Sequence, residues 1–173
     1  METSRRSFLK AGAVGALVLA AGGGIYRATR PSAPARFVLD GEARAALEAI
    51  VPVILAGALP AAADERRRAV AASVEGVHAA ILNLPLAVQE EVQDLFGLLA
   101  LAPARRLLTG IAGPWSAARE AEVAAFLQDW RGHRFALLRT AYGALHDLAL
   151  GAWYAQPASW QAIGYPGPLK ELS

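Results

Sequence analysis

The chain has 173 residues, of which 55% are hydrophobic and 18% are charged, and it contains no cysteine. This length corresponds to about one domain, and the lack of cysteine excludes disulfides, thiolate zinc sites, iron–sulfur clusters and covalently attached c-type haem. The first 35 residues hold five basic residues and one acidic residue, which leaves twelve basic and fourteen acidic residues in the remainder. The basic charge therefore belongs to the N-terminal segment, and we expect no binding of nucleic acid.

The N-terminal segment has the pattern of an export signal. Residues 4–10 read Ser-Arg-Arg-Ser-Phe-Leu-Lys, and a weakly apolar stretch of sixteen residues, rich in glycine and alanine, follows at 11–26. This stretch is shorter than the roughly 20 residues that span a bilayer. The segment resembles a bacterial twin-arginine (Tat) signal. The residues that carry the motif are Arg5, Arg6, Phe8 and Leu9.

A cleavage site for a signal peptidase follows the apolar stretch. Ala33 and Ala35 flank Pro34, which gives the small-x-small pattern that such peptidases cut. The sequence therefore predicts a signal peptide at residues 1–35, a single domain at residues 36–173 and a periplasmic location. An uncut leader would instead tether the protein to the outer face of the inner membrane.

The mature region predicts helices, because no segment after residue 36 alternates between apolar and polar residues as a strand does. Asp40 is expected to cap the first helix, in which Pro52 produces a kink or an early end. Asp64 is expected to cap the second helix, which opens on an exposed turn at 65–68. The inward positions are expected to be Leu47, Ile50, Val51, Ile54 and Leu55 in the first helix and Val70, Val74, Val77, Ile81 and Leu82 in the second.

Prolines mark the starts of the next two helices. Pro85 suits the first turn of a third helix, and Pro103 suits that of a short fourth helix that ends near Leu108. Gly110 and the Gly113-Pro114 pair then break the chain. The inward positions expected in the third helix are Val88, Val92, Leu95, Phe96 and Leu99.

Two further helices complete the predicted domain, which is an all-α bundle of about five to six helices. Ser116 is expected to cap the fifth helix, and the sixth runs from near Gly132 to about Trp153. An irregular C-terminal strap, rich in aromatic residues, proline and glycine, is expected at 155–173. The inward positions are expected to be Val123, Phe126, Leu127 and Trp130 in the fifth helix and Phe135, Leu138, Tyr142, Leu145, Leu148, Ala149 and Ala152 in the sixth.

Residues that could carry catalysis are sparse. The three histidines are His78, His133 and His146, and they match no metal-binding motif. A metal site built from His133 and His146 across a helix turn is one alternative. No serine lies in a nucleophile elbow, and no glycine-rich phosphate loop follows a strand. We therefore expect no catalytic residue and no cofactor in this chain.

Two surface features could bind a partner. The arginine runs at 66–68 and 105–106 are typical of a solvated face, with an acidic partner surface as the alternative. The C-terminal aromatic residues could fold back over the bundle, with Trp160 plugging the core, or anchor another protein. The partner-binding candidates are Trp153, Tyr154, Trp160, Tyr165, Pro166 and Pro168.

The sequence also carries a family resemblance. The Tat leader is followed by Ala-Ile-Val-Pro-Val-Ile-Leu at 49–55, and the chain ends on the pattern Trp-x-x-Ile-Gly-Tyr-Pro-Gly-Pro. These features resemble the gluconate 2-dehydrogenase small-subunit (subunit 3) family, which includes the γ subunits of bacterial FAD-dependent glucose dehydrogenases. The ending supplies the matching residues Trp160, Ile163, Gly164, Tyr165, Pro166, Gly167 and Pro168.

The resemblance implies a non-catalytic accessory subunit of a periplasmic, membrane-associated dehydrogenase. Its partners would be an FAD-containing large subunit of the glucose–methanol–choline type and a multihaem cytochrome c subunit. FAD and haem would then be bound by those partners, and the small subunit would stabilise the large one and carry it through the Tat translocase. The alternatives are a membrane-tethered structural protein and a small periplasmic metal-dependent enzyme.

Overall fold

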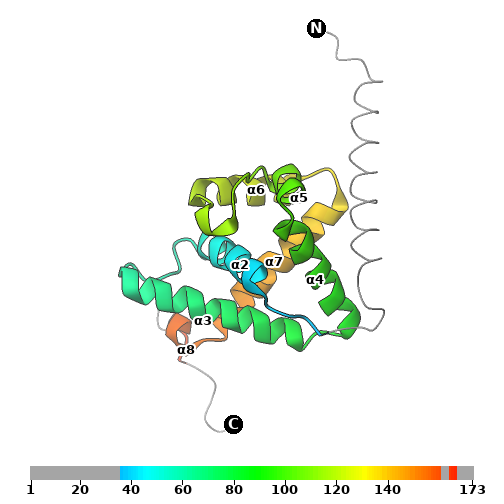
Figure 1. Cartoon of the computed structure of the whole chain (residues 1–173). Helices are drawn as coiled ribbons and strands as arrows, with labels where there is room; N and C mark the ends of the chain where they lie inside the picture. Colours follow the sequence, from blue (N-terminus) through cyan, green and yellow to red (C-terminus); the bar gives the residue numbers. More distant parts are fainter. Residues whose placement is uncertain (1–35, 161–163, 167–173) are drawn as a thin grey trace, which may run out of the picture. The chain divides into compact units, whose positions relative to one another are not determined.

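The computed structural model describes residues 36–160 and 164–166. The chain divides into two units, Met1–Pro34 and Ala35–Ser173, and every described residue belongs to the second. These residues form α-helices, one short 3₁₀ helix and no strand, which confirms the predicted all-α class (Figure 1). The elements are α2 (Gly41–Ile54), α3 (Ala63–Leu82), α4 (Leu86–Ala100), α5 (Ala102–Thr109), η1 (Trp115–Ala117), α6 (Glu120–Gly132), α7 (Ala136–Tyr154) and α8 (Pro157–Trp160).

Helix α2 lies at the centre of the bundle and packs against α3, α4, η1, α6 and α7 (Figure 1). Asp40 caps it as predicted, because the Ala43 backbone N–H donates to Asp40 Oδ1 at 2.8 Å. Pro52 lies in the last turn, and the helix ends two residues later. The early end predicted from this proline is therefore confirmed.

No helix in the described part of the chain is both long enough and apolar enough to cross a membrane.

The long helices α3 and α7 pack closely against each other. At the point of contact a Cβ added to Gly76 would lie 3.0 Å from Ala152 Cβ, so glycine allows the two backbones to approach. The predicted start of α3 is wrong, because the helix begins at Ala63 and Asp64 lies inside its first turn. The predicted stripe is correct for Val74, Val77 and Ile81, which are buried, and wrong for Leu82, which is 40% exposed.

Two tryptophans connect η1 to α4 and α6 to α5. The Trp115 indole N–H donates to Leu99 O at 3.1 Å, and the Trp130 indole N–H donates to Leu108 O at 2.8 Å. The Phe126 ring lies edge-to-face with both indoles. The prediction that Ser116 caps α6 is wrong, because Ser116 lies within η1 and the N-cap of α6 is Arg119. The four inward positions predicted for α6 are all buried, namely Val123, Phe126, Leu127 and Trp130.

In α4 and α7 the predicted inward residues are exposed at the start of the helix and buried further along it. Phe96 and Leu99 of α4 are buried as predicted, but Val88 in the first turn is 37% exposed. Leu145 of α7 is buried, whereas Phe135, which occupies the N-cap position of that helix, is 52% exposed.

Candidate partner-binding surface

The C-terminal aromatic residues occupy two different environments. Trp153 is 3% exposed and belongs to the hydrophobic core, so its prediction as a partner contact is wrong. Tyr154 is the next residue on α7 and is 43% exposed. Successive side chains on a helix point about 100° apart, which turns one ring inward and the other outward. Only the second of these rings is available to a partner.

Helix α8 places Trp160 beside the end of α7. The Ser159 side chain is fully buried, and its hydroxyl donates to Gln156 O at 2.7 Å. The Gln156 amide donates to Ala152 O at 2.9 Å and to Ser73 Oγ at 3.4 Å, which ties the segment to both α7 and α3. Four residues of the strap are therefore helical, where the sequence predicted irregular structure.

Trp160, Tyr154 and Tyr165 form a cluster that we call the aromatic end. The Trp160 indole N–H donates to Tyr154 O at 2.8 Å, and its ring lies edge-to-face with the Tyr165 ring at 5.5 Å between centroids. The Tyr165 N–H donates to Trp160 O at 2.9 Å, and Gly164 provides the left-handed turn, with φ of 69°, that brings the two rings together. Trp160 is half-buried and stands outside the hydrophobic core, so it does not plug the bundle.

The remaining candidates of the tail and leader are either exposed or outside the described residues. Pro166 is exposed next to the aromatic end. Pro168 lies outside the described residues, as do the other motif residues Ile163 and Gly167. The export residues Arg5, Arg6, Phe8 and Leu9 also lie outside the described residues.

The arginine runs differ from each other. In the first run Arg67 pairs with Asp64, and Arg66 lies 3.6 Å from a Glu120 carboxylate oxygen, so the run is a partly paired surface. In the second run Arg105 is only 5% exposed, so its prediction as part of a solvated face is wrong. Its guanidinium Nη1 donates to the carbonyls of Leu99 and Ala100. Arg105 thereby caps the C-terminal end of α4, where a positive charge is favourable.

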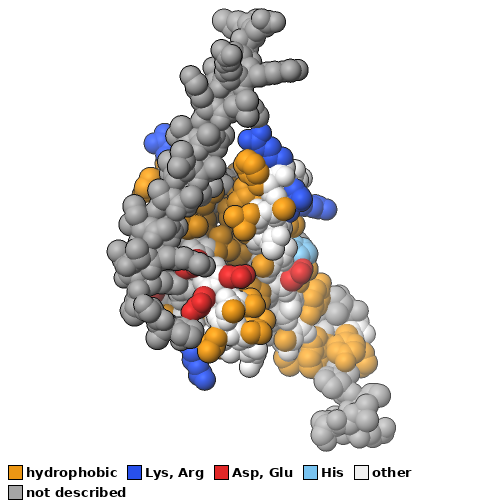
Figure 2. All heavy atoms as spheres, turned by 90° about the vertical axis from the view of Figure 1, so that its right-hand side faces the viewer, with side chains coloured by type: hydrophobic (Ala, Val, Ile, Leu, Met, Phe, Trp, Pro, Cys, Tyr) orange, Lys and Arg blue, Asp and Glu red, His pale blue; other side chains and the backbone are white. Residues whose placement is uncertain are grey.

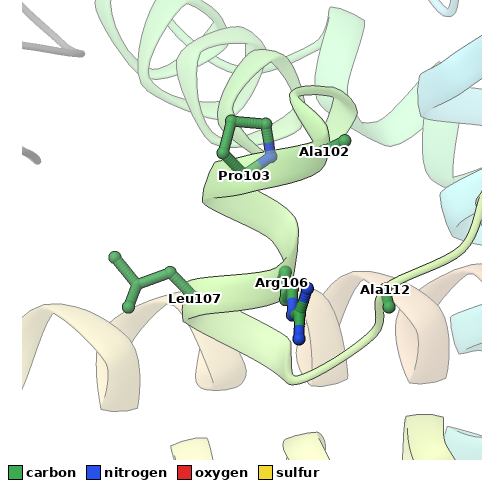
Figure 3. Close-up of a pocket in the computed structure, with 5 residues that line it drawn as sticks. All are labelled: Ala102, Pro103, Arg106, Leu107 and Ala112. Atoms are coloured by element: carbon green, nitrogen blue, oxygen red, sulfur yellow. The ribbon is translucent and has the colours of Figure 1, made fainter.

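Arg106, by contrast, is exposed and lines a shallow pocket on α5 (Figure 3). The other lining residues are Ala102, Pro103, Leu107 and Ala112. Figure 3 shows Leu107 and Pro103 pointing away from Arg106 in different directions. Small-molecule sites need several convergent polar groups, and this pocket offers a single charged side chain. We therefore assign it no ligand.

The two histidines of the alternative metal site have separate local partners. His133 Nδ1 accepts from the Phe135 N–H at 3.1 Å. His146 stacks on Tyr142 and lies 3.2 Å from Asp147 Oδ1. Among residues 36–160 and 164–166, no three histidine or carboxylate side chains gather closely enough to hold a metal ion.

An apolar groove lies between α3, α4 and α7 and was not predicted from the sequence. It has a volume of about 320 Å³, and Asp147 is its one charged lining residue. Exposed leucines surround the α3–α4 corner, with Leu82 at 40% and Leu86 at 44%. A signal was present in the sequence, because the connection Leu82-Asn-Leu-Pro-Leu86 is rich in leucine and free of charge. Connections between helices are usually polar.

Comparison of the chain with protein-family models, with curated proteins and with solved structures found no match. The resemblance to the small-subunit family therefore depends on the sequence motifs alone.

Proposed function

We propose that the chain is the non-catalytic small subunit of an exported, membrane-associated FAD-dependent dehydrogenase. In this role it stabilises the flavoprotein subunit and carries it through the Tat translocase, while FAD and c-type haem are held by the partners. The observation that carries the proposal is the position of the family-like ending. Its residues Trp160 and Tyr165 stand in an aromatic cluster at the surface, outside the hydrophobic core.

An exposed aromatic cluster of this kind suits a protein interface. Tyrosine and tryptophan are the residues that most often dominate binding energy, because each presents a large apolar ring and one hydrogen-bonding group. Tyr165 is 47% exposed and Tyr154 is 43% exposed. The indole hydrogen bond to Tyr154 O and the contact with the Tyr165 ring hold the Trp160 ring before binding, which lowers the entropy lost when a partner is engaged.

The start of the described domain is compatible with cleavage of the leader. Among the described residues Phe37 is the first that belongs to the core, and its N–H donates to Gln89 Oε1 at 3.1 Å. The next N–H, that of Val38, donates to Gln93 Oε1 at 2.8 Å. A cut after Ala35 therefore leaves an N-terminal segment that is anchored to α4.

The export part of the proposal is tested with a pair of matched double variants in the native host. Arg5→Lys/Arg6→Lys changes the motif, and Arg27→Lys/Arg30→Lys makes the same chemical change outside it. We expect the first pair to leave the flavoprotein subunit in the cytoplasm, and the second pair to leave it in the periplasm, as measured by mass spectrometry of fractionated cells. Equal periplasmic amounts of the flavoprotein in both strains would contradict the proposal.

A further inference from the structure

The apolar groove is a preformed feature of the α3–α4 corner. Gln89 is only 3% exposed, and its amide donates to Leu82 O at 3.2 Å and to Leu84 O at 2.8 Å. These bonds hold the backbone of the corner, at which Leu82 and Leu86 are exposed. The groove is lined by Ala80, Leu84, Val88, Val92, Ala144, Asp147, Leu148, Gly151 and Ala152.

The wall formed by α7 consists largely of small residues. Ala144 and Gly151 lie on the groove side of this helix and are exposed. A Cβ added to Gly151 would meet no atom within 4 Å. The stretch from Ala144 to Ala152 covers about two helical turns, or roughly 12 Å. A second helix can therefore lie along α7 at close range and place its apolar side chains in the groove.

The segments that form the groove carry net negative charge. Residues 69–104 and 140–160 contain five acidic residues and no lysine or arginine, although Arg44 of α2 pairs with one of the five, Glu75, at 2.7 Å. Asp147 lines the groove, and Glu91 stands one turn from Val88 on the exposed side of α4. Figure 2 shows acidic side chains among the hydrophobic ones across the middle of the face seen there, with basic side chains towards its margins.

We infer that this groove binds an amphipathic helix of the flavoprotein subunit that carries lysine or arginine beside its apolar face. The charge selects this occupant. An anionic bilayer surface is repelled by Asp147 and the neighbouring Glu91. A symmetric dimer through the groove would place Asp147 and Glu91 of one copy against the same residues of the other. A basic amphipathic helix matches both the apolar lining and the negative charge of Asp147 and Glu91.

The groove is tested first with a synthetic probe and the full chain. The probe is a fluorescent helix of about four turns, with leucines on one face and lysines along both flanks. A counterpart carries glutamates instead of lysines. Fluorescence anisotropy is expected to give binding of the lysine helix at least about tenfold tighter than that of the glutamate helix. Equal affinities for the two helices would overturn the inference.

Matched variants locate the binding. Ala144→Trp fills the groove, and Ala124→Trp makes the same change on the exposed face of α6. The first is expected to weaken the lysine helix about tenfold or more and the second less than about twofold. Gly151→Leu repeats the block at a position where the added Cβ is free of contacts. Equal affinities for the groove variants and the α6 variant would overturn the inference.

A charge variant provides an independent readout. Asp147→Lys reverses the charge in the groove, and Asp129→Lys makes the same change on α6. We expect Asp147→Lys to weaken the lysine helix about fivefold at low salt, with less difference at high salt, because rim charges are screened. Asp129→Lys is expected to leave the affinity within about twofold. The same loss in both variants would contradict a role for the groove charge.

The inference that the bound helix belongs to the flavoprotein subunit rests on the proposed function, and it is tested separately. C-terminally tagged wild type, Ala144→Trp and Ala124→Trp are purified from the native host, and the flavoprotein subunit is measured by mass spectrometry. Loss of the flavoprotein from Ala144→Trp alone supports the inference. Equal retention by all three chains overturns the groove and leaves the proposed function intact. A wild-type chain that retains no flavoprotein overturns the proposed function and this source of the helix.

Discussion

Replacement of Trp160 by alanine is expected to weaken the complex with the flavoprotein subunit by about thirtyfold or more. Truncation of an aromatic anchor in an interface costs about 2 kcal/mol or more, and this corresponds to about thirtyfold in Kd. The variant also removes the indole N–H bond to Tyr154 O and the edge-to-face contact with the Tyr165 ring. Both losses loosen the aromatic end, so the contribution of Tyr165 to the affinity for the flavoprotein subunit falls as well.

The matched comparison is Arg67→Ala, which changes an exposed side chain on a different helix. Arg67 is 74% exposed and pairs with Asp64 one turn away. Such a surface pair contributes between about 0 and 1 kcal/mol, so the affinity is expected to change less than about threefold. The assay is surface plasmon resonance of each variant against the purified flavoprotein subunit.

Folding of the free chain is measured in parallel, because Trp160 also makes contacts within the domain. Loss of one hydrogen bond and one aromatic contact is expected to lower the free energy of unfolding by about 1 to 2 kcal/mol, as read from urea denaturation. Tyr165→Ala serves as the second variant, since that ring is 47% exposed. Equal losses of affinity for Trp160→Ala and Arg67→Ala would refute the aromatic end as an anchor.

Three further predictions concern the bundle itself. Asp40→Ala removes the cap on Ala43 N–H and is expected to lower the free energy of unfolding by about 1 kcal/mol; an unchanged urea midpoint would contradict it. Gly76→Leu forces α3 away from Ala152 and is expected to lower that free energy by about 2 to 3 kcal/mol, whereas Ala72→Leu on the exposed face of α3 should change it little. Hydrogen bonds from Arg119 and its charge lower the pKa of Glu122 from 4.5 to about 2. The stabilisation by this carboxylate is therefore fully present above about pH 4.5 and is lost as the pH falls towards 2. Thermal melts of Glu122→Gln are expected to show a weaker acid dependence than those of the wild type, and identical profiles would contradict the capping role.

The sequence predicted those helix faces that repeat an apolar residue every three or four positions. Helix α6 is the clearest case, because all four of its predicted inward residues are buried. Trp153 could have been assigned to the core by the same rule, since it follows the buried Ala149 by four positions. At this position the helical spacing is a stronger signal than the preference of tryptophan for interfaces.

The features that the sequence did not predict depend on contacts between elements. Arg105 is buried where its guanidinium donates hydrogen bonds to the last carbonyls of α4. No periodic pattern in the sequence indicates such a contact between a side chain and a helix end. Trp115 is 1% exposed within a three-residue turn, which is too short to have a period. The groove lies between α3, α4 and α7, and Val88 in its lining is 37% exposed. It depends on how these three helices pack, which the periodicity of a single helix does not indicate.

The most direct test of the account is affinity purification of the C-terminally tagged full chain from its native host, followed by mass spectrometry and an absorbance spectrum. The account predicts a co-purifying protein of flavoenzyme size together with the absorbance bands of a bound flavin. A chain that purifies alone and colourless would contradict its assignment as the small subunit of a flavin-dependent dehydrogenase.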